Sequence, residues 1–328
     1  MPIPTQIRVL GALGVLASLV ACSAGGSTAI SPMPVSGRGA PMIRHLVSYD
    51  SCSASATIEY VSDAFYNVIN VYAGKIVGQA PCGQIASTLL NNPQGLFVKP
   101  GTHDLYVANT NAHNVLVFRR GSTSPYNTYT DPSVQDPLDV AVAEDGTVIA
   151  SNYVQAHGAE AGSLSTWIRG PNGGTFVGNF PMTNDLQGEF VAVASNGTVY
   201  YDDVDQNFDQ GALWSLSCPA GACGAQTQVA GVSFKFPGGM AFSAKGDLLV
   251  NDQNAATADT FELPNPTPST FPLAGFPFGM AIDKKNHHWF ISDAISNKSS
   301  EYTYPGGVLV GSVTGASGGI TSGIAADP

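Results

Sequence analysis

Residues 93–118, PQGLFVKPGTHDLYVANTNAHNVLVF, carry the pattern that decides the fold. A nearly continuous apolar run at 95–98 is followed by a turn, by a second β-type run that ends in Val107-Ala108-Asn109, and by an alternating run at 114–118. Apolar, β-branched and aromatic residues separated by short turns predict antiparallel strands. The first should be buried on both faces and the third should have one face in water.

The ending of the second run, a small or apolar residue followed by Asp or Asn, occurs six times. The copies are Val61-Ser62-Asp63, Val107-Ala108-Asn109, Ala150-Ser151-Asn152, Tyr201-Asp202-Asp203, Val250-Asn251-Asp252 and Ile291-Ser292-Asp293. In five copies an apolar strand stands about 13 positions upstream. The first copy lacks that strand, and the chain ends on an unpaired one at 323–327. This pattern predicts an all-β fold, a six-bladed β-propeller of four-stranded antiparallel blades, closed by pairing of the N- and C-terminal strands.

Three segments resemble NHL repeats: 93–98 with 105–118, 237–241 with 248–252, and 278–283 with Asp293. The resemblance extends over about residues 55–328, although the repeats at 138 and 189 lack the leading Gly and Val115 stands where NHL repeats often carry Arg. It implies a propeller of the superfamily that includes gluconolactonases and streptogramin lyases. Members of that superfamily range from ligand-binding scaffolds to enzymes, so the resemblance implies the fold and leaves the function open.

The N-terminus predicts export. Arg8 precedes an apolar run at 9–20, so residues 1–21 are expected to be a signal peptide, and Leu19-Val20-Ala21-Cys22 resembles the lipobox of bacterial lipoproteins. This resemblance implies a lipid on Cys22 and an envelope location, at the outer membrane or cell surface, where Ser23 resembles an outer-membrane sorting residue. A plain secretory signal is the alternative. Residues 22–44 have the composition of a flexible tether, which leaves 45–328 for the propeller.

Composition limits the partners. The chain has 328 residues, of which 44% are hydrophobic and 11% charged, with 37 Gly, 22 Pro and a net charge of −11. Because this charge repels polyanions, nucleic acid is excluded as a partner. We expect a monomer that meets the membrane through its lipid anchor and binds a protein, peptide or carbohydrate ligand.

Four cysteines remain after Cys22, an even number in an oxidising compartment, which predicts two disulfides. Three connectivities are open. Cys218 and Cys223 enclose a short loop, so we favour their pairing, which leaves Cys52 with Cys82. A zinc site is the alternative, but the spacing lacks paired C-x₂-C motifs.

The six Asp and Asn endings should lie on one rim of the propeller, because the loop after the second strand opens on the same face as the entry to the next blade. That rim is the expected ligand face, with Asp63, Asn109, Asn152, Asp203, Asp252 and Asp293. The structural alternative is that these short side chains cap turns. Their repetition in every blade favours capping.

Departures from the repeat are the stronger site candidates. Asp139 replaces a strand-start Gly and Glu189 lies one residue before the equivalent position, so both should place a carboxylate near the central channel. Buried carboxylates have shifted pKa values or bind a cation. The resemblance to gluconolactonases implies calcium held there by Glu, Asp and Asn. Solvated rim carboxylates are the alternative.

A second calcium candidate is the loop with Asp203, Asp205, Asn207 and Asp209, whose alternating oxygen ligands resemble the first half of a calcium loop. It departs from that pattern at Phe208 and Trp214, and a hydrated acidic loop is the alternative. Calcium is thus the one candidate cofactor.

His113 and His157 fall in rim loops, and the resemblance to streptogramin lyases implies a rim His as base with a metal. The chain contains none of the common hydrolase, protease or nucleotide-binding motifs. The leading hypothesis is a lipid-anchored binding or scaffold module without catalysis. The alternative is a metal-dependent lactonase, hydrolase or lyase with Asp139 and Glu189 as ligands and His113 or His157 as base.

Overall fold

The structure, a computed structural model, describes residues 52, 57–74, 76–153, 162–182, 187–205, 207, 209–263, 265, 267–283, 287–315 and 319–327. All belong to one compact unit, Ser48–Pro328. The predicted signal peptide, Cys22, the tether and His157 lie outside the described residues. No helix within the described ranges is long and apolar enough to cross a membrane.

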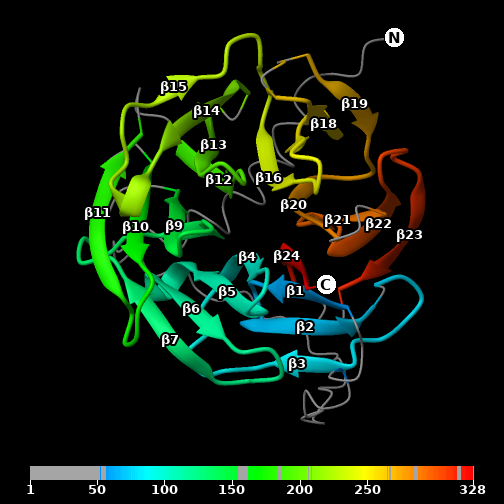
Figure 1. Cartoon of the computed structure of the whole chain (residues 1–328). Coiled ribbons are helices and arrows are strands. Elements are labelled where there is room, and N and C mark those ends of the chain that lie inside the picture. Colours follow the sequence, from blue (N-terminus) through cyan, green and yellow to red (C-terminus); the bar gives the residue numbers. More distant parts are fainter. Residues whose placement is uncertain are drawn as a thin grey trace, which may run out of the picture. The chain divides into compact units, whose positions relative to one another are not determined.

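Six four-stranded antiparallel sheets form a ring of blades (Figure 1). From the inner to the outer strand, blade 1 contains β24 (Thr321–Asp327), β1 (Ile58–Asp63), β2 (Val68–Ala73) and β3 (Gly83–Ile85), and blade 2 contains β4 (Pro93–Lys99), β5 (Asp104–Asn109), β6 (Asn114–Phe118) and β7 (Pro125–Thr130). Blade 3 contains β8 (Pro137–Val142), β9 (Thr147–Asn152), β10 (Ser163–Ile168) and β11 (Thr175–Pro181).

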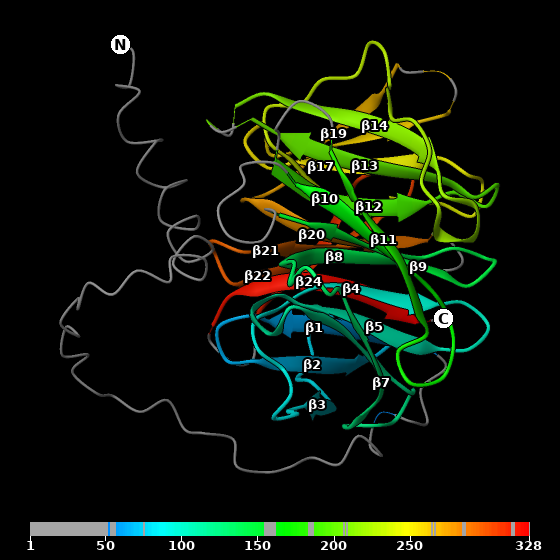
Figure 2. The ribbon, with the colours of Figure 1, turned by 90° about the vertical axis from the view of Figure 1, so that its left-hand side faces the viewer.

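Blade 4 contains β12 (Gln187–Val193), β13 (Thr198–Val204), β14 (Gly211–Ser217) and β15 (Thr227–Gln228). Blade 5 contains β16 (Pro237–Phe242), β17 (Leu248–Asp252), β18 (Thr257–Phe261) and β19 (Ser269–Pro272), and blade 6 contains β20 (Pro277–Ile282), β21 (His288–Asp293), β22 (Lys298–Thr303) and β23 (Leu309–Thr314). In the side view the strands run roughly along the ring axis (Figure 2).

The ends of the chain close the ring. β24 pairs antiparallel with β1, with Ile58 opposite Asp327 and Val61 opposite Ile324. The last strand of the chain therefore supplies the inner strand that blade 1 lacks, and the predicted architecture and closure are confirmed.

The glycine at the start of most inner strands is required by close packing around the axis. A β-carbon at Gly239 would overlap the backbone nitrogen of Met280 in the next blade, and one at Gly323 would overlap the carbonyl oxygen of Gln94. Inner strands of neighbouring blades therefore touch backbone to backbone at this level. Asp139 and Phe190 occupy the same position in blades 3 and 4.

The core lies between the blades. In blades 2 and 3, ring centroids follow one another from Tyr106 to Tyr129 at 6.4 Å, to Trp167 at 5.9 Å and to Phe176 at 5.9 Å. Alternating aromatic residues of the middle and outer strands thus fill the space between sheets, which is where such residues contribute most to stability.

Both predicted disulfides are present. Cys52 is bonded to Cys82 and Cys218 to Cys223. The first joins the chain just before β1 to the segment before β3, and the second closes the short loop after β14.

Candidate functional site

The strand registers place all six Asp and Asn endings on one face of the ring. Each residue lies opposite the first or second residue of its own inner strand: Asp63 opposite Thr321, Asn109 opposite Pro93, Asn152 opposite Pro137, Asp203 opposite Gly188, Asp252 opposite Pro237 and Asp293 opposite Pro277. We call this face the rim face, and the face with the turns between inner and second strands the turn face.

The three rim aspartates of blades 1, 5 and 6 cap the turns that follow them. Asp63 Oδ1 accepts hydrogen bonds from the backbone N–H groups of Phe65 and Tyr66, at 3.1 and 3.0 Å. Asp252 Oδ1 accepts from Ala255 at 3.0 Å, and Asp293 Oδ1 accepts from Ile295 and Ser296 at 3.0 and 2.9 Å. All three side chains are buried. Their oxygens are engaged by the protein's own backbone, which is the capping role.

The other three endings are also bonded internally. Asn109 donates to the carbonyl oxygen of Leu89 at 2.9 Å, and Asn152 donates to the hydroxyls of Ser163 and Ser165 at 3.0 and 2.7 Å. Asp203 Oδ1 accepts from the N–H of Ala212 at 3.2 Å, and burial raises the pKa of Asp203 to about 7. The repeated endings therefore build the rim.

The capped turns of blades 1 and 6 carry large apolar side chains that are exposed to solvent. Phe65, Tyr66 and Ile295 are 66%, 50% and 51% exposed, and Leu89, on the connection from blade 1 to blade 2, is 55% exposed. We call Ile295, Phe65, Tyr66 and Leu89 the apolar arc. The Phe65 and Tyr66 rings contact each other edge to face, with centroids 5.0 Å apart.

Hydrogen bonds join the turns of the apolar arc through the connections between blades. Asp63 Oδ2 accepts from the N–H of Gly319, and Thr321 Oγ1 donates to the carbonyl of Asp293 at 2.9 Å, so residues 319–321 link the turns of blades 6 and 1. On the other side, Asn67 Oδ1 accepts from the N–H of Asn92 at 2.6 Å. The arc is thus one continuous stretch of rim.

Our sequence reasoning missed the arc because it treated the rim turns as equivalent. The residues two after the rim Asp or Asn are Phe65, Asn111, Asn254 and Ile295 in blades 1, 2, 5 and 6. A comparison of these positions would have shown large apolar residues in blades 1 and 6 and Asn in blades 2 and 5, which is the signal that identifies the arc.

Asp139 and Glu189 are both buried at the junction of blades 3 and 4. Asp139 Oδ2 accepts from the N–H of Val191 at 3.2 Å, and its carboxylate fills the space that Gly95 leaves open, because a β-carbon there would overlap Oδ1. Burial raises the pKa of Asp139 to about 7 and the pKa of Glu189 well above its usual range.

Asp202 is a third buried carboxyl in this region, and sequence reasoning did not single it out. Its Oδ1 accepts from the N–H of Phe190 at 2.7 Å. Its pKa is raised well above the usual range by burial and by the charges of Glu189, Asp203 and Asp139. Glu189 Oε1 and Asp202 Oδ2 have no hydrogen-bond partner among the described residues. The available signal was its position, which carries Ser, Ala or Asn in the other blades.

The candidate calcium ligands do not converge. Within the described ranges, no three His, Cys, Asp or Glu side chains are grouped so that they could hold a metal ion. Asp205 Oδ1 accepts from the N–H groups of Asp209 and Gln210, and Asp205 Oδ2 accepts from Asn207 Nδ2 at 3.3 Å, so this loop is capped by its own residues. Asp203 faces Ala212 inside blade 4 instead.

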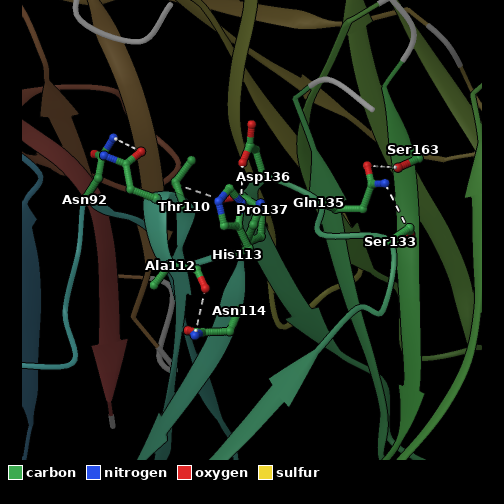
Figure 3. A network of polar contacts seen from close by, with 11 residues as sticks. Asn92, Thr110, Ala112, His113, Asn114, Ser133, Gln135, Asp136, Pro137 and Ser163 are labelled. Carbon is green, nitrogen blue, oxygen red and sulfur yellow. Dashed lines mark hydrogen bonds and ion pairs between the residues drawn. The ribbon is translucent and has the colours of Figure 1, made fainter. Parts of the chain in front are cut away.

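His113 lies on the rim between blades 2 and 3 (Figure 3). It closes the turn after β5 in the left-handed conformation, with φ 55°, and its Nδ1 is 2.6 Å from Asp136 Oδ1. Both side chains are partly exposed, and Thr110 Oγ1 donates to the carbonyl of Pro137 beside them. The contact is close enough for an ion pair, but His113 Nδ1 lacks hydrogen-bond geometry with this carboxylate among the described residues.

A cavity of about 860 Å³ follows the ring axis. Its lining begins at the level of Gly95, Asp139 and Phe190 and continues along all six inner strands to turn-face residues such as Lys99 and Lys245. At the rim end, the ring of Phe190 contacts that of Phe278, with centroids 5.0 Å apart. The cavity therefore extends to the turn face and not to the rim on which the sequence placed the ligand.

No family model matches the chain and no curated protein matches it. Solved structures share its fold. A nidogen/laminin complex is 12% identical with a TM-score of 0.64, covering 82% of this chain and 98% of that one. A functionally unknown protein from Desulfotomaculum acetoxidans is 15% identical with a TM-score of 0.57, over 82% and 98%. Virginiamycin B lyase from Staphylococcus aureus is 11% identical with a TM-score of 0.52, over 78% and 80%. These likenesses show a propeller fold that serves mixed functions.

Proposed function

We propose that this chain is a lipid-anchored, extracytoplasmic propeller that binds a protein partner through the apolar arc. The observation that carries the proposal is the exposure of four large apolar side chains on rim turns that are joined by hydrogen bonds. Isolated exposed apolar residues are ordinary on a protein surface, whereas clustered ones mark interaction sites.

The geometry of the turns favours binding. Asp63 and Asp293 hold the backbone of their turns with two hydrogen bonds each, and Asn67 and Asn297 close those turns with φ 57° and 50°. The arc is therefore presented on a rigid backbone. Because its turns are already ordered in the free protein, binding of a partner costs little of their conformational entropy. Aromatic side chains such as Phe65 and Tyr66 are typical anchors of protein interfaces.

Charge indicates the chemistry of the partner. The net charge is −11, and three of the described carboxylates on the rim face, Asp136, Asp205 and Asp209, are at least partly exposed. The other described carboxyls of this face are buried: Asp63, Asp131, Asp139, Glu189, Asp202, Asp203, Asp252 and Asp293. Among described residues, Lys235 and Lys298 are the lysines beside this rim. The complementary partner is a protein segment that presents apolar side chains flanked by Lys or Arg.

The anchor completes the proposal. A lipid on Cys22 would hold the chain at a bacterial membrane, and residues 22–44 would give the propeller a reach on the order of 25 Å. The partner would then be another protein of the envelope.

Peptide selection tests the proposal. A random peptide library is panned on the full chain, on a Phe65→Ser, Tyr66→Ser, Ile295→Ser variant, and on a Leu309→Ser control, whose leucine is 48% exposed on the outer strand β23. We expect the wild-type and control chains to enrich peptides that combine apolar residues with Lys or Arg, and the arc variant to lose them. Enrichment of acidic peptides, or equal enrichment on the arc variant, would refute the proposal. Self-association of the wild-type chain at the arc, seen by sedimentation, would assign the arc to a second copy instead.

A second candidate function, a lyase or lactonase, is favoured by the proximity of His113 Nδ1 to Asp136 Oδ1, 2.6 Å apart, since a carboxylate beside an imidazole is a common feature of general bases. It predicts turnover of a lactone or depsipeptide substrate with added Mg²⁺ or Ca²⁺, and loss of that turnover in His113→Ala. The same variant should leave peptide binding at the arc unchanged. Absence of metal-dependent turnover in the wild-type chain would eliminate this candidate.

A further inference from the structure

The inner strands of all six blades line the axial cavity, and apolar residues occupy successive levels of these strands. One residue beyond the strand-start position, the six blades carry Leu96, Val140, Val191, Met240, Met280 and Ile324, and all six line the cavity. The strand ends carry Val98, Val142, Val193, Phe242, Ile282 and Ala326. Ten of these twelve side chains pack in the clusters between blades, so strand backbone and the apolar groups that reach the axis together form the walls. The lining is still more apolar than polar, and the volume is within the usual range of ligand cavities.

One charged side chain lies at the closed end of this cavity. Asp139 is buried, and its carboxylate lies between Gly95 of blade 2 and Val191 of blade 4, which places it on the axial side of blade 3. The ring of Phe190 lies at the same level. The other four blades have glycine at this position, so Asp139 and Phe190 contribute the side chains at this level of the cavity.

The buried carboxyl groups beside this closed end, Glu189 and Asp202, have no basic partner among the described residues. Glu189 Oε1 and Asp202 Oδ2 are buried without hydrogen-bond partners, and the charges of Glu189 and Asp139 both act on Asp202. In the described part of the chain, no lysine or arginine forms an ion pair with any of the three carboxyls. The lysines that line the cavity, Lys99 and Lys245, lie at the turn-face mouth, and Lys99 is about 13 Å from Gly95 along its strand at about 3.3 Å per residue.

We propose that the axial cavity is a binding site for a small organic cation, a primary amine with an apolar body, whose ammonium group donates to Asp139 while its body lies along the apolar walls. An ammonium beside a carboxylate and an aromatic ring gains a charge-assisted hydrogen bond and a cation–π contact. A metal ion fits less well, because Asp139 is the one carboxylate that lines the closed end and the described residues offer no group of three ligands. This site is separate from the apolar arc on the rim face.

Calorimetric titration of the full chain with benzylamine tests the assignment, with benzyl alcohol as the neutral analogue, above pH 7 where Asp139 is ionised. We expect one benzylammonium per chain, at least about tenfold tighter than the alcohol, because a charged hydrogen bond is lost with the alcohol. Asp139→Asn should remove that difference. Asp145→Asn, which makes the same charge change on the exposed turn beside the cavity, should preserve it.

Three results would overturn the assignment. They are equal binding of amine and alcohol to the wild-type chain, unchanged amine affinity in Asp139→Asn, and displacement of benzylammonium by a stoichiometric Ca²⁺ that binds more tightly. The comparison of amine with alcohol needs no variant, so it remains decisive if Asp139→Asn fails to fold. Loss of peptide binding at the arc would leave this result unaffected.

Discussion

Buried carboxyl groups near the inner strands are held in their neutral form at acidic pH. Burial raises the pKa of Asp139 to about 7, and it also raises the pKa values of Glu189 and Asp202 well above their usual range. In the position of Asp202, Ser62 and Ser292 donate to a carbonyl of the next blade. A protonated carboxyl is the form of Asp202 that can donate in the same way.

Glu59 gives a pH-dependent prediction at this scale. Burial, then the charges of Glu301 and Asp283, raise its pKa from 4.5 to about 8. Between these values the unfolded chain releases a proton that the folded chain keeps, so the stability that is present below pH 4.5 is lost as pH rises towards 8. Glu59→Gln should therefore raise Tm relative to the wild type at alkaline pH and change it little at pH 4.5.

Thermal unfolding of both chains across this pH range measures the difference. A Tm difference that stays constant with pH would contradict the raised pKa. Asp145→Asn, on an exposed turn, is the matched control, because burial does not raise the pKa of Asp145 above its usual value.

In blades 1, 3, 5 and 6, the residue just before the rim Asp or Asn joins its blade to the next one. Ser62 Oγ donates to the carbonyl of Gln94 in blade 2 at 2.8 Å and accepts from the N–H of Gly323 at 2.6 Å. Ser151 donates to the carbonyl of Glu189 at 2.7 Å, and Asn251 to that of Gly279 at 3.4 Å. Each of these second strands is thereby bonded to the inner strand of the following blade.

Ser62→Ala should destabilise the propeller, because it leaves a buried N–H and a buried carbonyl without their partner. We expect a loss of about 2 kcal/mol in the free energy of unfolding. Ser122→Ala, which removes an exposed hydroxyl that bonds within its own turn, should change it by less than about 0.5 kcal/mol. Denaturant unfolding measures both. Equal effects of the two substitutions would show that the junction contributes nothing.

The two disulfides should differ in their contributions. Cys52–Cys82 spans 30 residues and Cys218–Cys223 spans 5. Because the entropy that a cross-link removes from the unfolded chain grows with loop length, removal should cost about 4 kcal/mol for the first pair and about 2 kcal/mol for the second. Paired Cys→Ser variants compared by denaturant unfolding check this order, and the reverse order would contradict it.

The elements could be predicted from sequence because their signals are local. Apolar runs, turn glycines and the repeated Asp or Asn define each strand within a few residues, and the missing first strand identified β24 as the closing strand. Asp202 and the apolar arc were missed because both become visible only when equivalent positions of different blades are compared. The extension of the cavity to the turn face depends on Phe190 and Phe278, which come from different blades and meet only in the folded ring.

At the scale of the whole molecule, the ring separates two faces with different chemistry. The rim face carries the apolar arc and, near the starts of the inner strands, the buried carboxyl groups. The turn face carries the mouth of the axial cavity, with Lys99 and Lys245. Binding at one face is therefore expected to leave the other accessible.

The proposed anchor gives a prediction for the full chain in its cell. Cys22→Ser should remove the lipid and move the protein from the membrane fraction to the soluble fraction, because several acyl chains account for stable anchoring. Cell fractionation with immunoblotting measures the distribution. Retention of the variant in the membrane fraction would contradict the anchor and leave the plain secretory signal as the alternative.

The affinity of one peptide for two variants tests the proposed function most directly. The strongest peptide selected on the wild-type chain is titrated against the Phe65→Ser, Tyr66→Ser, Ile295→Ser chain and against the Leu309→Ser chain by fluorescence anisotropy. We predict that the arc variant binds at least about tenfold more weakly, since loss of buried aromatic anchors removes most of the binding energy, and that the control binds as the wild type does. Equal affinity of the peptide for the arc variant and the wild type would contradict the assignment of the rim as the protein-binding face.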